Sequence, residues 1–556
     1  MDSNKKGFFV FRRSLSAAMN SLSLLASVAA TLGAYALFAL LKLYYNEWTS
    51  PLRDVSGPKS DHWLFGNRKQ LFDNFDGKEG LWTQQYGRNL RMNGFIGFSN
   101  LYTTDPKAIQ HVLSNSNLYQ KPVSDRYVIG RIIGPGLLVA EEDVHKKQRR
   151  IMNPAFGPTH LRALTELFVE KSKQLRDIWT AKATQNGGTV KLNVVPEFST
   201  AALDIIGKAG FNYDFKSLGK ETGDFRDELH EAFVEVGTVG DLQRTFVGAL
   251  RISFPALRPF LPKTNIDRTI DAAQDTMRRI GMGLLEESKR QAAAGAESRS
   301  SRDLLSLLVR ANMDKDVPES QRLSDDDVLA QVPTFLVAGH ETTSTAASWT
   351  MFELAKNPEI QSRLRDELLT IDNDTPSMDE LNALTYLDCV VRETLRAHAP
   401  VPFVGRVAMR DDIIPLQHPY TDRYGMVHDT IHIRKGQSVV LPILAINREP
   451  GIWGPDALDY IPERWSGTVS TSIPGVWSQM LTFLGGPHAC IGFRFSIVEL
   501  KALLFTLVRA LEFELAVPKE DIGRIKAPAV QLPFVRSEAG AGSQMPLLIK
   551  PFVQAT

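Results

Sequence analysis

Cysteine is scarce in this chain of 556 residues, which contains only Cys389 and Cys490. Two cysteines cannot build a disulfide framework, and neither lies in a C-x-x-C or histidine-rich cluster of the kind that holds a structural metal. This scarcity favours a reducing compartment for the main part of the chain. An excess of charge of one sign is also lacking, because 64 Lys and Arg residues balance 63 Asp and Glu residues. Nucleic acid is therefore not an expected partner.

Internal repeats and long linkers are absent from most of the chain, whereas one long hydrophobic run stands near its beginning. Residues 22–41 are uncharged and long enough to cross a hydrocarbon core of roughly 30 Å as a helix. A cleaved signal peptide is the alternative, since a basic segment precedes the run. The run exceeds the usual signal core of about 7–15 residues, and an aromatic segment follows it instead of a cleavage site. We predict a membrane anchor at 22–41 after an N-terminal tail, 1–21.

The orientation of this anchor is ambiguous from charge. Four basic residues precede the run and three follow it, which weakly favours a cytoplasmic N-terminus and a main domain in the lumen. The scarcity of cysteine favours the opposite side. After the anchor, residues 42–70 are rich in turn formers and predict a short connector, and residues 71–556 form one main domain.

Helical periodicity dominates the main domain, and short β-rich pieces lie between the helices. Segments 94–98 and 437–441 are the clearest candidate strands. The sequence therefore predicts a mainly α fold with small β-sheets. Apolar residues recur at helical spacing in six segments, 160–181, 223–237, 267–291, 324–356, 358–370 and 379–397.

The segment F-L-G-G-P-H-A-C-I-G over residues 483–492 places one cysteine in a glycine-punctuated loop with a helical pattern directly behind it. Backbone N–H groups and the helix N-terminus would lower the thiol pKa of Cys490, and the glycines leave room for a flat group. A lone cysteine is more often a small buried hydrophobe than a ligand. The complete string, however, favours a thiolate presented to a metal.

The longest predicted helix, 324–356, carries Ala-Gly-His-Glu-Thr-Thr at its centre, residues 338–343. Ser324 and Asp327 form a predicted capping box at its start. Because the flanking turns are apolar nearly all round, this helix is predicted to be buried. A buried glutamate and threonine need a reason, and a solvated patch does not supply one.

Together these segments resemble the cytochrome P-450 superfamily. The first string matches its F-x-x-G-x-(R/H)-x-C-x-G signature, and the second matches its (A/G)-G-x-(D/E)-T-(T/S) motif. By this resemblance Cys490 is the axial thiolate ligand of a haem iron. The other cofactor-binding residues in this loop are Phe483, Gly486, His488 and Gly492, with His488 directed at a haem propionate.

The resemblance also assigns residues at the dioxygen side and at the cofactor's edge. Gly339 opens space for dioxygen, while Glu341 and Thr342 relay protons. Segment 142–156 resembles the helix that carries W-x-x-x-R, with His145 in place of tryptophan. His145 and Arg149 are therefore expected to contact a propionate, as is Arg406.

Two further motifs are structural by resemblance. Glu393 and Arg396 stand in the E-x-x-R spacing, and Arg464 belongs to a P-E-R-W element at 462–465. The three are expected to form a triad that locks the core beside the haem. On segment 142–156, Lys146, Lys147 and Arg150 are either an ordinary solvated face or a docking patch for an acidic electron donor.

The resemblance covers nearly the whole chain and implies a haem-thiolate monooxygenase similar to fungal microsomal members. Such an enzyme takes electrons from an NADPH-dependent flavoprotein reductase and oxidises a lipophilic small molecule: a terpenoid, sterol, fatty acyl chain or polycyclic aromatic, in secondary metabolism or xenobiotic oxidation. Segment 246–260, aromatic and apolar, is expected to roof its pocket. The resemblance also implies a single-pass protein of the endoplasmic reticulum, in contact with membrane lipid and with its catalytic domain in the cytosol. The count of basic residues on either side of the run 22–41 favours the opposite orientation. The alternatives are a haem-thiolate isomerase or dehydratase, and a haem-binding protein without turnover.

Overall fold

The structure is a computed structural model of the whole chain. It describes residues 41–63, 65–67, 78–219, 227–229, 231–232, 246–293, 303–313, 318, 322–467, 469, 471–527 and 529–553, together with scattered residues between 27 and 39.

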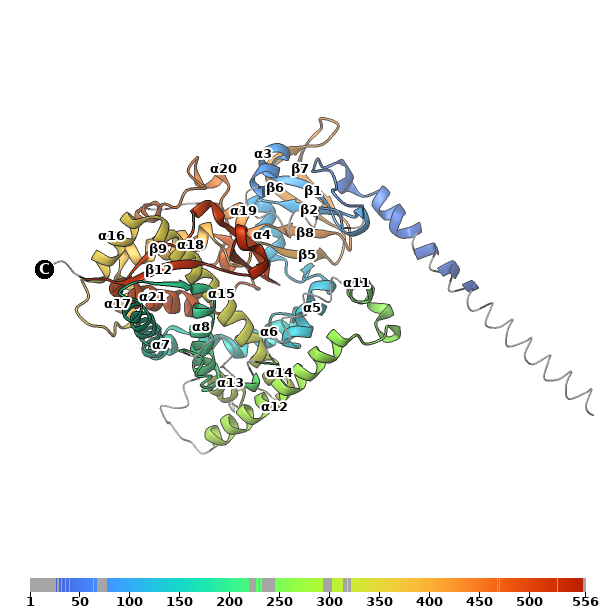
Figure 1. Ribbon diagram of the computed structural model, residues 1–556. Helices are drawn as coiled ribbons and strands as arrows, with labels where there is room; N and C mark the ends of the chain where they lie inside the picture. Colours follow the sequence, from blue (N-terminus) through green and yellow to red (C-terminus); the bar gives the residue numbers. More distant parts are fainter. Residues whose placement is uncertain are drawn as a thin grey trace, which may run out of the picture.

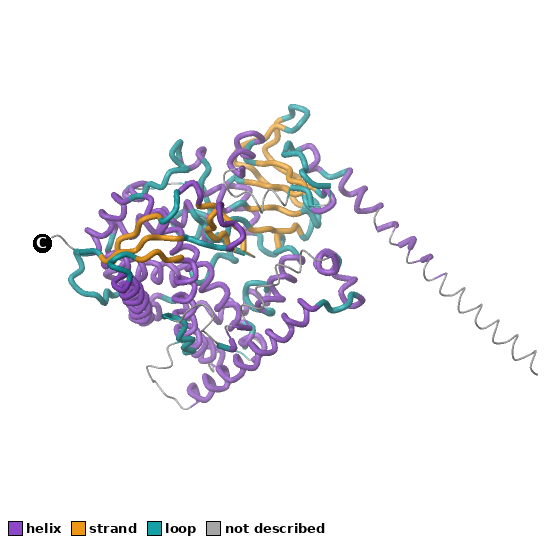
Figure 2. Tube along the Cα trace, in the orientation of Figure 1, coloured by secondary structure: helices purple, strands orange, loops and turns teal. Residues whose placement is uncertain are grey.

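Helices make up most of the described chain, and the strands gather in two regions (Figure 2). This arrangement confirms the prediction of a mainly α fold with small sheets. The helices are α3 (Lys78–Tyr86), α4 (Pro106–Ser114), α5 (Val123–Ile133), α6 (Glu142–Met152), α7 (Pro158–Gln185), α8 (Val194–Phe211), α11 (Phe246–Ser253), α12 (Asn265–Ala293), α13 (Leu304–Met313), α14 (Asp325–Leu329), α15 (Gln331–Lys356), α16 (Pro358–Leu368), α17 (Met378–Ala383), α18 (Thr385–Ala397), α19 (Ile443–Asn447), α20 (Pro450–Trp453) and α21 (Phe493–Ala510).

The largest sheet has five strands in the order β1-β2-β8-β5-β3, and a three-stranded sheet has the order β4-β12-β9. Two hairpins, β6-β7 and β10-β11, complete the strands. The bounds are β1 (Asn89–Asn93), β2 (Ser99–Thr103), β3 (Tyr119–Gln120), β4 (Val190–Asn193), β5 (Val404–Ala408), β6 (Asp412–Thr421), β7 (Val427–Ile433), β8 (Ser438–Leu441), β9 (Leu511–Leu515), β10 (Ile522–Ala527), β11 (Val530–Val535) and β12 (Pro546–Pro551).

Helix α15 runs through the middle of the helical part and packs against α8, α18 and α21 (Figure 1). The predicted continuous helix 324–356 is in fact two helices, with Ala330 between α14 and α15. Pro333 explains the break, because it has no backbone N–H to donate and its ring crowds the carbonyl four residues earlier. The predicted capping box of Ser324 and Asp327 is present at the start of α14. Helix α15 alone spans about 39 Å.

The predicted helix 379–397 is also divided. Leu384 has extended backbone angles and separates α17 from α18. The N-terminus of α18 is capped from outside, since the Glu367 carboxylate accepts hydrogen bonds from the backbone N–H groups of Tyr386 and Leu387 at 2.7 and 2.8 Å. A side chain far away in sequence thus fixes a helix start that local spacing did not indicate.

One predicted strand is wrong. Segment 94–98 forms the turn between β1 and β2, a 3-10 helix over Phe95–Gly97. Ile96 and Gly97 both have positive φ, at 53° and 79°, which is turn geometry and cannot continue a strand. The second prediction, 437–441, is confirmed by β8.

The predicted connector 42–70 takes part in the compact structure. Residues 41–48 are helical, and Leu52 and Val55 lie in the hydrophobic core. The Glu47 carboxylate accepts hydrogen bonds from the backbone and side chain of Ser99 at 3.0 and 2.5 Å, which ties this segment to β2. The predicted span 22–41 lies largely outside the described residues. Among the residues that are described, no helix is both long and apolar enough to cross a membrane.

Candidate active site

The loop that carries Cys490 is held by its own backbone. The N–H of Cys490 donates to the carbonyl of Phe483 at 2.9 Å, and the N–H of Ala489 donates to the carbonyl of Gly486 at 3.1 Å. Helix α21 begins three residues after the cysteine. This fold brings the backbone N–H of Gly492 to the Cys490 thiol, where it favours the thiolate.

The glycines of this loop serve backbone packing. A Cβ on Gly485 would lie 1.8 Å from the carbonyl oxygen of Pro474, and one on Gly486 would lie 2.5 Å from that of Leu113. Gly486 also has a φ of +69°, which side chains rarely adopt. Only at Gly492 does a Cβ meet no atom closer than 3.7 Å. The close approach of two neighbouring chain segments therefore explains Gly485 and Gly486.

Cys490 is solvent-accessible although protein atoms surround it closely. Burial raises the pKa of its thiol, and the Gly492 N–H and the charge of Arg149 only partly oppose this. The backbone N–H thus acts on the thiol pKa in the expected direction, but burial outweighs it in the unligated thiol. A sulfur that is enclosed yet accessible suits binding to a metal, which itself keeps a thiolate deprotonated.

A cluster of cationic and imidazole groups lies beside this loop. The rings of His145, on α6, and His488 stack with centroids 3.8 Å apart. Nε2 of His488 contacts a carboxylate oxygen of Glu141 at 3.2 Å, and Nζ of Lys121 contacts Glu141 and Nδ1 of His488, both at 3.2 Å. Burial holds the pKa of His145 down to about 3 and lowers that of His488. Burial also lowers the pKa of Lys121 to about 8, although Glu141 opposes this.

The two predicted arginine contacts have different surroundings. Arg149 donates a hydrogen bond to the carbonyl of Ala489, and so ties α6 to the Cys490 loop. Arg406 is only 4% exposed, and its guanidinium donates to the carbonyl of its neighbour Gly405 at 2.8 Å. No described carboxylate lies within ion-pair distance of Arg406. Burial lowers its pKa, and the more distant charges of Glu141 and Asp125 only partly oppose this.

The centre of α15 is accessible within an otherwise buried helix. Residues 331–336 and 343–355 are buried, whereas all six residues from 337 to 342 are partly or fully exposed. Burial nevertheless raises the pKa of Glu341 to about 7. The Thr342 hydroxyl donates to the carbonyl of Ala338 at 2.7 Å. An acid that titrates near neutrality beside a hydroxyl, in one accessible turn, is suited to proton transfer.

Gly339 has a packing role in the same turn. A Cβ at this position would lie 2.8 Å from Cγ1 of Ile206, on α8. The glycine thus allows α8 and α15 to approach closely. Its expected role at the dioxygen site stays a prediction.

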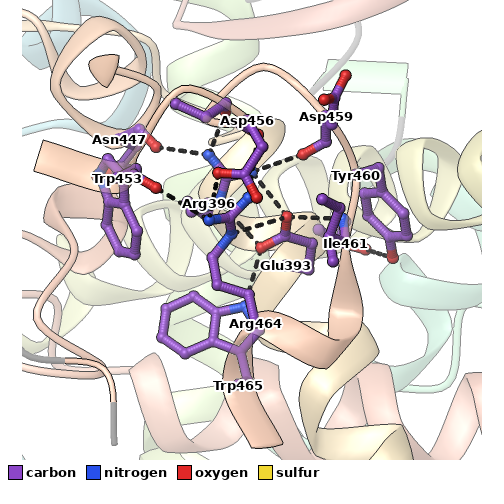
Figure 3. A network of polar contacts seen from close by, with 12 residues as sticks. Glu393, Arg396, Asn447, Trp453, Asp456, Asp459, Tyr460, Ile461, Arg464 and Trp465 are labelled. Carbon is purple, nitrogen blue, oxygen red and sulfur yellow. Dashed lines mark hydrogen bonds and ion pairs between the residues drawn. The ribbon is translucent and has the colours of Figure 1, made fainter. Parts of the chain in front are cut away.

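Glu393, Arg396 and Arg464 are brought together at the end of α18 (Figure 3). Arg396 donates two hydrogen bonds to Glu393, at 2.9 and 2.7 Å, and both side chains are fully buried. Arg464 lies 3.6 Å from the Glu393 carboxylate. The indole N–H of Trp465 and the backbone N–H of Ile461 also donate to Glu393, both at 2.9 Å.

The arginines of this network also hold backbone carbonyls. Arg396 donates to the carbonyls of Asn447, Ala457 and Asp459, and Arg464 donates to that of Trp453 and to Asp456. The network therefore fastens the segment 447–465 to α18. It is a structural network.

These observations test whether the site fits a haem with an axial thiolate. An enclosed but accessible cysteine, a buried arginine without a carboxylate partner, and a neighbouring Lys–His cluster supply the ligand and the counter-charges that an iron porphyrin with two carboxylates needs. The accessible turn of α15 supplies an acid and a hydroxyl. The residues therefore fit the group.

Sequence reasoning missed Lys121 and Glu141. Glu141 is buried and Lys121 is half-buried, and both contact His488. Nothing in their local sequence marks them, because their importance comes from a contact with a residue more than 340 positions away. Their contacts with the two ring nitrogens orient the His488 ring.

Two further predictions concern the basic face of α6 and segment 246–260. On α6, Lys146 and Arg150 are exposed and Lys147 is half-buried. Lys146 pairs with Asp143 at 3.1 Å, whereas Arg150 forms no ion pair with an acidic residue in the described part of the chain. Segment 246–260 forms α11 and a 3-10 helix, Pro255–Phe260. Phe254, between the two helices, and Leu257 and Phe260, on the 3-10 helix, are exposed.

Comparison with known proteins gives a consistent result. Residues 56–533 match the family model described as cytochrome P-450. The chain is 48% identical over 519 residues to cytochrome P-450 monooxygenase 205 of Postia placenta, covering 91% of this chain and 94% of that protein. It is 47% identical over 537 residues to cytochrome P-450 monooxygenase 128 of the same fungus, covering 94% and 97%. A ganoderic acid synthetase of Ganoderma lucidum is 32% identical over 493 residues, covering 84% and 88%.

Proposed function

The chain belongs to the cytochrome P-450 family and is a monooxygenase, and we propose that it inserts one atom of dioxygen into a lipophilic small molecule. The accessible turn of α15, with Glu341 and Thr342 at its centre, is the observation that carries this proposal. A relative that only rearranged or dehydrated its substrate would need no proton-delivering acid at this place.

The haem would be held by Cys490 through its iron and by Arg406, Arg149, His145 and His488 around its carboxylates. When bound, it supplies the redox chemistry that activates dioxygen. The protein's part is to bind, orient and deliver protons. Glu341, with its pKa near 7, takes protons from solvent at neutral pH, and the Thr342 hydroxyl passes them toward the reacting oxygen.

The orientation of His488 follows from its hydrogen bonds. If Lys121 donates to Nδ1, then Nε2 carries the ring proton and faces the Glu141 carboxylate at 3.2 Å. Both ring nitrogens are therefore engaged by the protein. These contacts hold the His488 ring in place beside Lys121, and its expected contact with a propionate stays a prediction.

The substrate class proposed is lipophilic: a terpenoid, sterol, fatty acyl chain or polycyclic aromatic. The apolar, exposed side chains of Phe254, Leu257 and Phe260 on the segment after α11 support entry of such a molecule from a membrane. The name of one relative, a ganoderic acid synthetase, supports secondary metabolism as the setting. A panel of these four compound classes identifies the substrate.

The electron donor proposed is an NADPH-dependent flavoprotein reductase that docks on the exposed face of α6. Arg150 lies on that face and forms no ion pair with any described acidic residue, and α6 contacts the Cys490 loop through Arg149. A donor bound there would be close to the thiolate side of the site.

We further propose that residues 22–41 anchor the chain in the endoplasmic reticulum, with the catalytic domain in the cytosol. The helical segment 41–48, with exposed Leu43, Tyr44, Tyr45 and Trp48, supports an interfacial belt next to the anchor. Alkaline extraction of membranes and protease protection of tagged ends test this. Release of the full-length chain by alkali would exclude the anchor.

The experiment that tests the function is turnover under isotopically labelled dioxygen with a reductase and NADPH. The monooxygenase proposal predicts one labelled oxygen atom in the product and one in water. A product formed without the label would show an isomerase or dehydratase instead. Absence of NADPH consumption across the whole panel would favour a haem-binding protein without turnover.

A further inference from the structure

A second acid lies behind the proposed site. Glu499 is on α21, nine residues after Cys490, and is 1% exposed. Neither of its carboxylate oxygens has a hydrogen-bond partner, and no basic group forms an ion pair with it among the described residues. An unpaired carboxylate in such surroundings costs several kcal/mol, so the group avoids ionisation. Burial accordingly raises its pKa well above the usual range.

A hydroxyl with an equally unusual environment faces it. Helix α15 contains seven Ser and Thr residues, and six of them donate a hydrogen bond to a carbonyl of the preceding turn. Thr343 alone does not, although it is only 2% exposed and its oxygen is buried. The six that donate in the usual way are Thr334, Thr342, Ser344, Thr345, Ser348 and Thr350.

The two unpartnered groups belong to helices that pack on each other, α15 and α21. The Thr343 hydroxyl lies near enough to Glu499 to lower the pKa of the carboxyl, though not in standard hydrogen-bond geometry. A small rotation of either side chain, or one buried water between them, would satisfy both. Their partnership explains why Thr343 departs from the pattern of its six neighbours.

We propose that Glu499 is a neutral carboxylic acid paired with Thr343, and that this pair is a positioning device which fixes the turn of α15 carrying Glu341 and Thr342 against the helix that follows Cys490. Side chains of successive residues in a helix point about 100° apart. Holding Thr343 toward α21 therefore fixes the direction in which Thr342 points. Glu499 acts through Thr343 and does not itself touch the reacting atoms.

The pairing is tested without turnover. The infrared difference spectrum between wild type and Glu499→Gln at neutral pH contains the carbonyl band of a protonated carboxyl. In Thr343→Val this band shifts to higher frequency, because the carboxyl loses its partner. In the matched control Thr350→Val, whose hydroxyl bonds its own helix, the band does not move. Carboxylate bands in place of the protonated band would overturn the proposal.

The positioning role is tested with carbon monoxide bound to the reduced haem, whose C–O stretching band senses polar groups on the facing helix turn. Thr343→Val and Glu499→Gln shift or split this band, whereas Thr343→Ser, which keeps the hydroxyl, retains the wild-type band. A band that is the same in Thr343→Val as in wild type would overturn the positioning role. Glu499→Gln keeps size and hydrogen-bonding capacity, so the test does not depend on a variant that fails to fold.

Discussion

The imidazole rings of His145 and His488 stack with their centroids 3.8 Å apart, and this contact joins helix α6 to the loop that carries Cys490. The two histidines stand where the family more often has tryptophan and arginine. Together they form a stacked pair of polar rings beside the proposed cofactor site. Glu141 and Lys121 contact the two ring nitrogens of His488.

Arg406→Met should weaken haem retention while leaving the haem-free protein as stable or more stable. The buried guanidinium has no carboxylate within ion-pair distance among the described residues, so its removal relieves a desolvation cost there. A charge-assisted hydrogen bond contributes about 1.5–3 kcal/mol, so haem should dissociate about 10- to 100-fold faster. Haem transfer to an apoprotein scavenger and thermal unfolding of the apo form measure both effects. Arg410→Met, at an exposed neighbour, should change neither; equal haem loss in the two variants would contradict the assignment.

Glu341→Gln should remove a pH dependence of stability. The folded pKa of Glu341, about 7, lies above its ordinary value of 4.5, so the folded state binds the proton more tightly. The stability this contributes is fully present below about pH 4.5 and is lost as the pH rises through about 7. Relative to wild type, Glu341→Gln should therefore become more stable across this window, by at most about 3 kcal/mol. Denaturant unfolding of the haem-free proteins at several pH values measures this, with Thr342→Val as a control that keeps the wild-type pH dependence. A constant difference between Glu341→Gln and wild type would show that Glu341 is already ionised.

Arg396→Ala should destabilise the fold strongly. It leaves the buried carboxylate of Glu393 without its main partner, and breaking a buried pair in this way costs roughly 3–5 kcal/mol. Arg363→Ala removes an exposed pair with Glu463 and should cost at most about 1 kcal/mol. Urea unfolding midpoints and the haem content of the purified proteins compare the two. Similar losses of stability in both variants would contradict the larger contribution assigned to the buried network.

Arg150→Glu should slow reduction by the flavoprotein reductase, by roughly tenfold at low salt, and the difference should shrink as salt screens the charges. Stopped-flow reduction in the presence of carbon monoxide measures the rate. Lys519→Glu makes the same charge change on a different exposed segment and should leave the rate near wild type. Equal effects of the two substitutions would point to overall charge and not to α6.

The parts of the site that lie in contiguous segments could be predicted from the sequence. The Cys490 loop, the acid and hydroxyl in the middle of α15, and the Glu393–Arg396 spacing are each visible within ten residues. The contacts of Lys121 and Glu141 with His488 could not be predicted, because they join residues far apart in sequence. The same holds for Glu499 and Thr343, whose environment is a property of two packed helices.

Local patterns also misplaced some helix boundaries and one strand. Apolar periodicity continues through Ala330 and Leu384, yet a proline in one case and capping by a distant glutamate in the other divide the helices. Segment 94–98 has strand composition but turn dihedrals. At Cys490 the backbone N–H lowers the thiol pKa as expected, but the larger, opposing effect of burial depends on tertiary packing and could not be predicted from the local sequence.

The most direct test of the account is the carbon monoxide difference spectrum of the reduced, haem-loaded protein beside Cys490→Ala. The account predicts a Soret band at the red-shifted position of a thiolate-ligated haem in wild type, and its loss in Cys490→Ala prepared at the same protein concentration. Absence of the red-shifted band from folded, haem-replete wild type, or its persistence in Cys490→Ala, would contradict the assignment of Cys490 as the iron ligand.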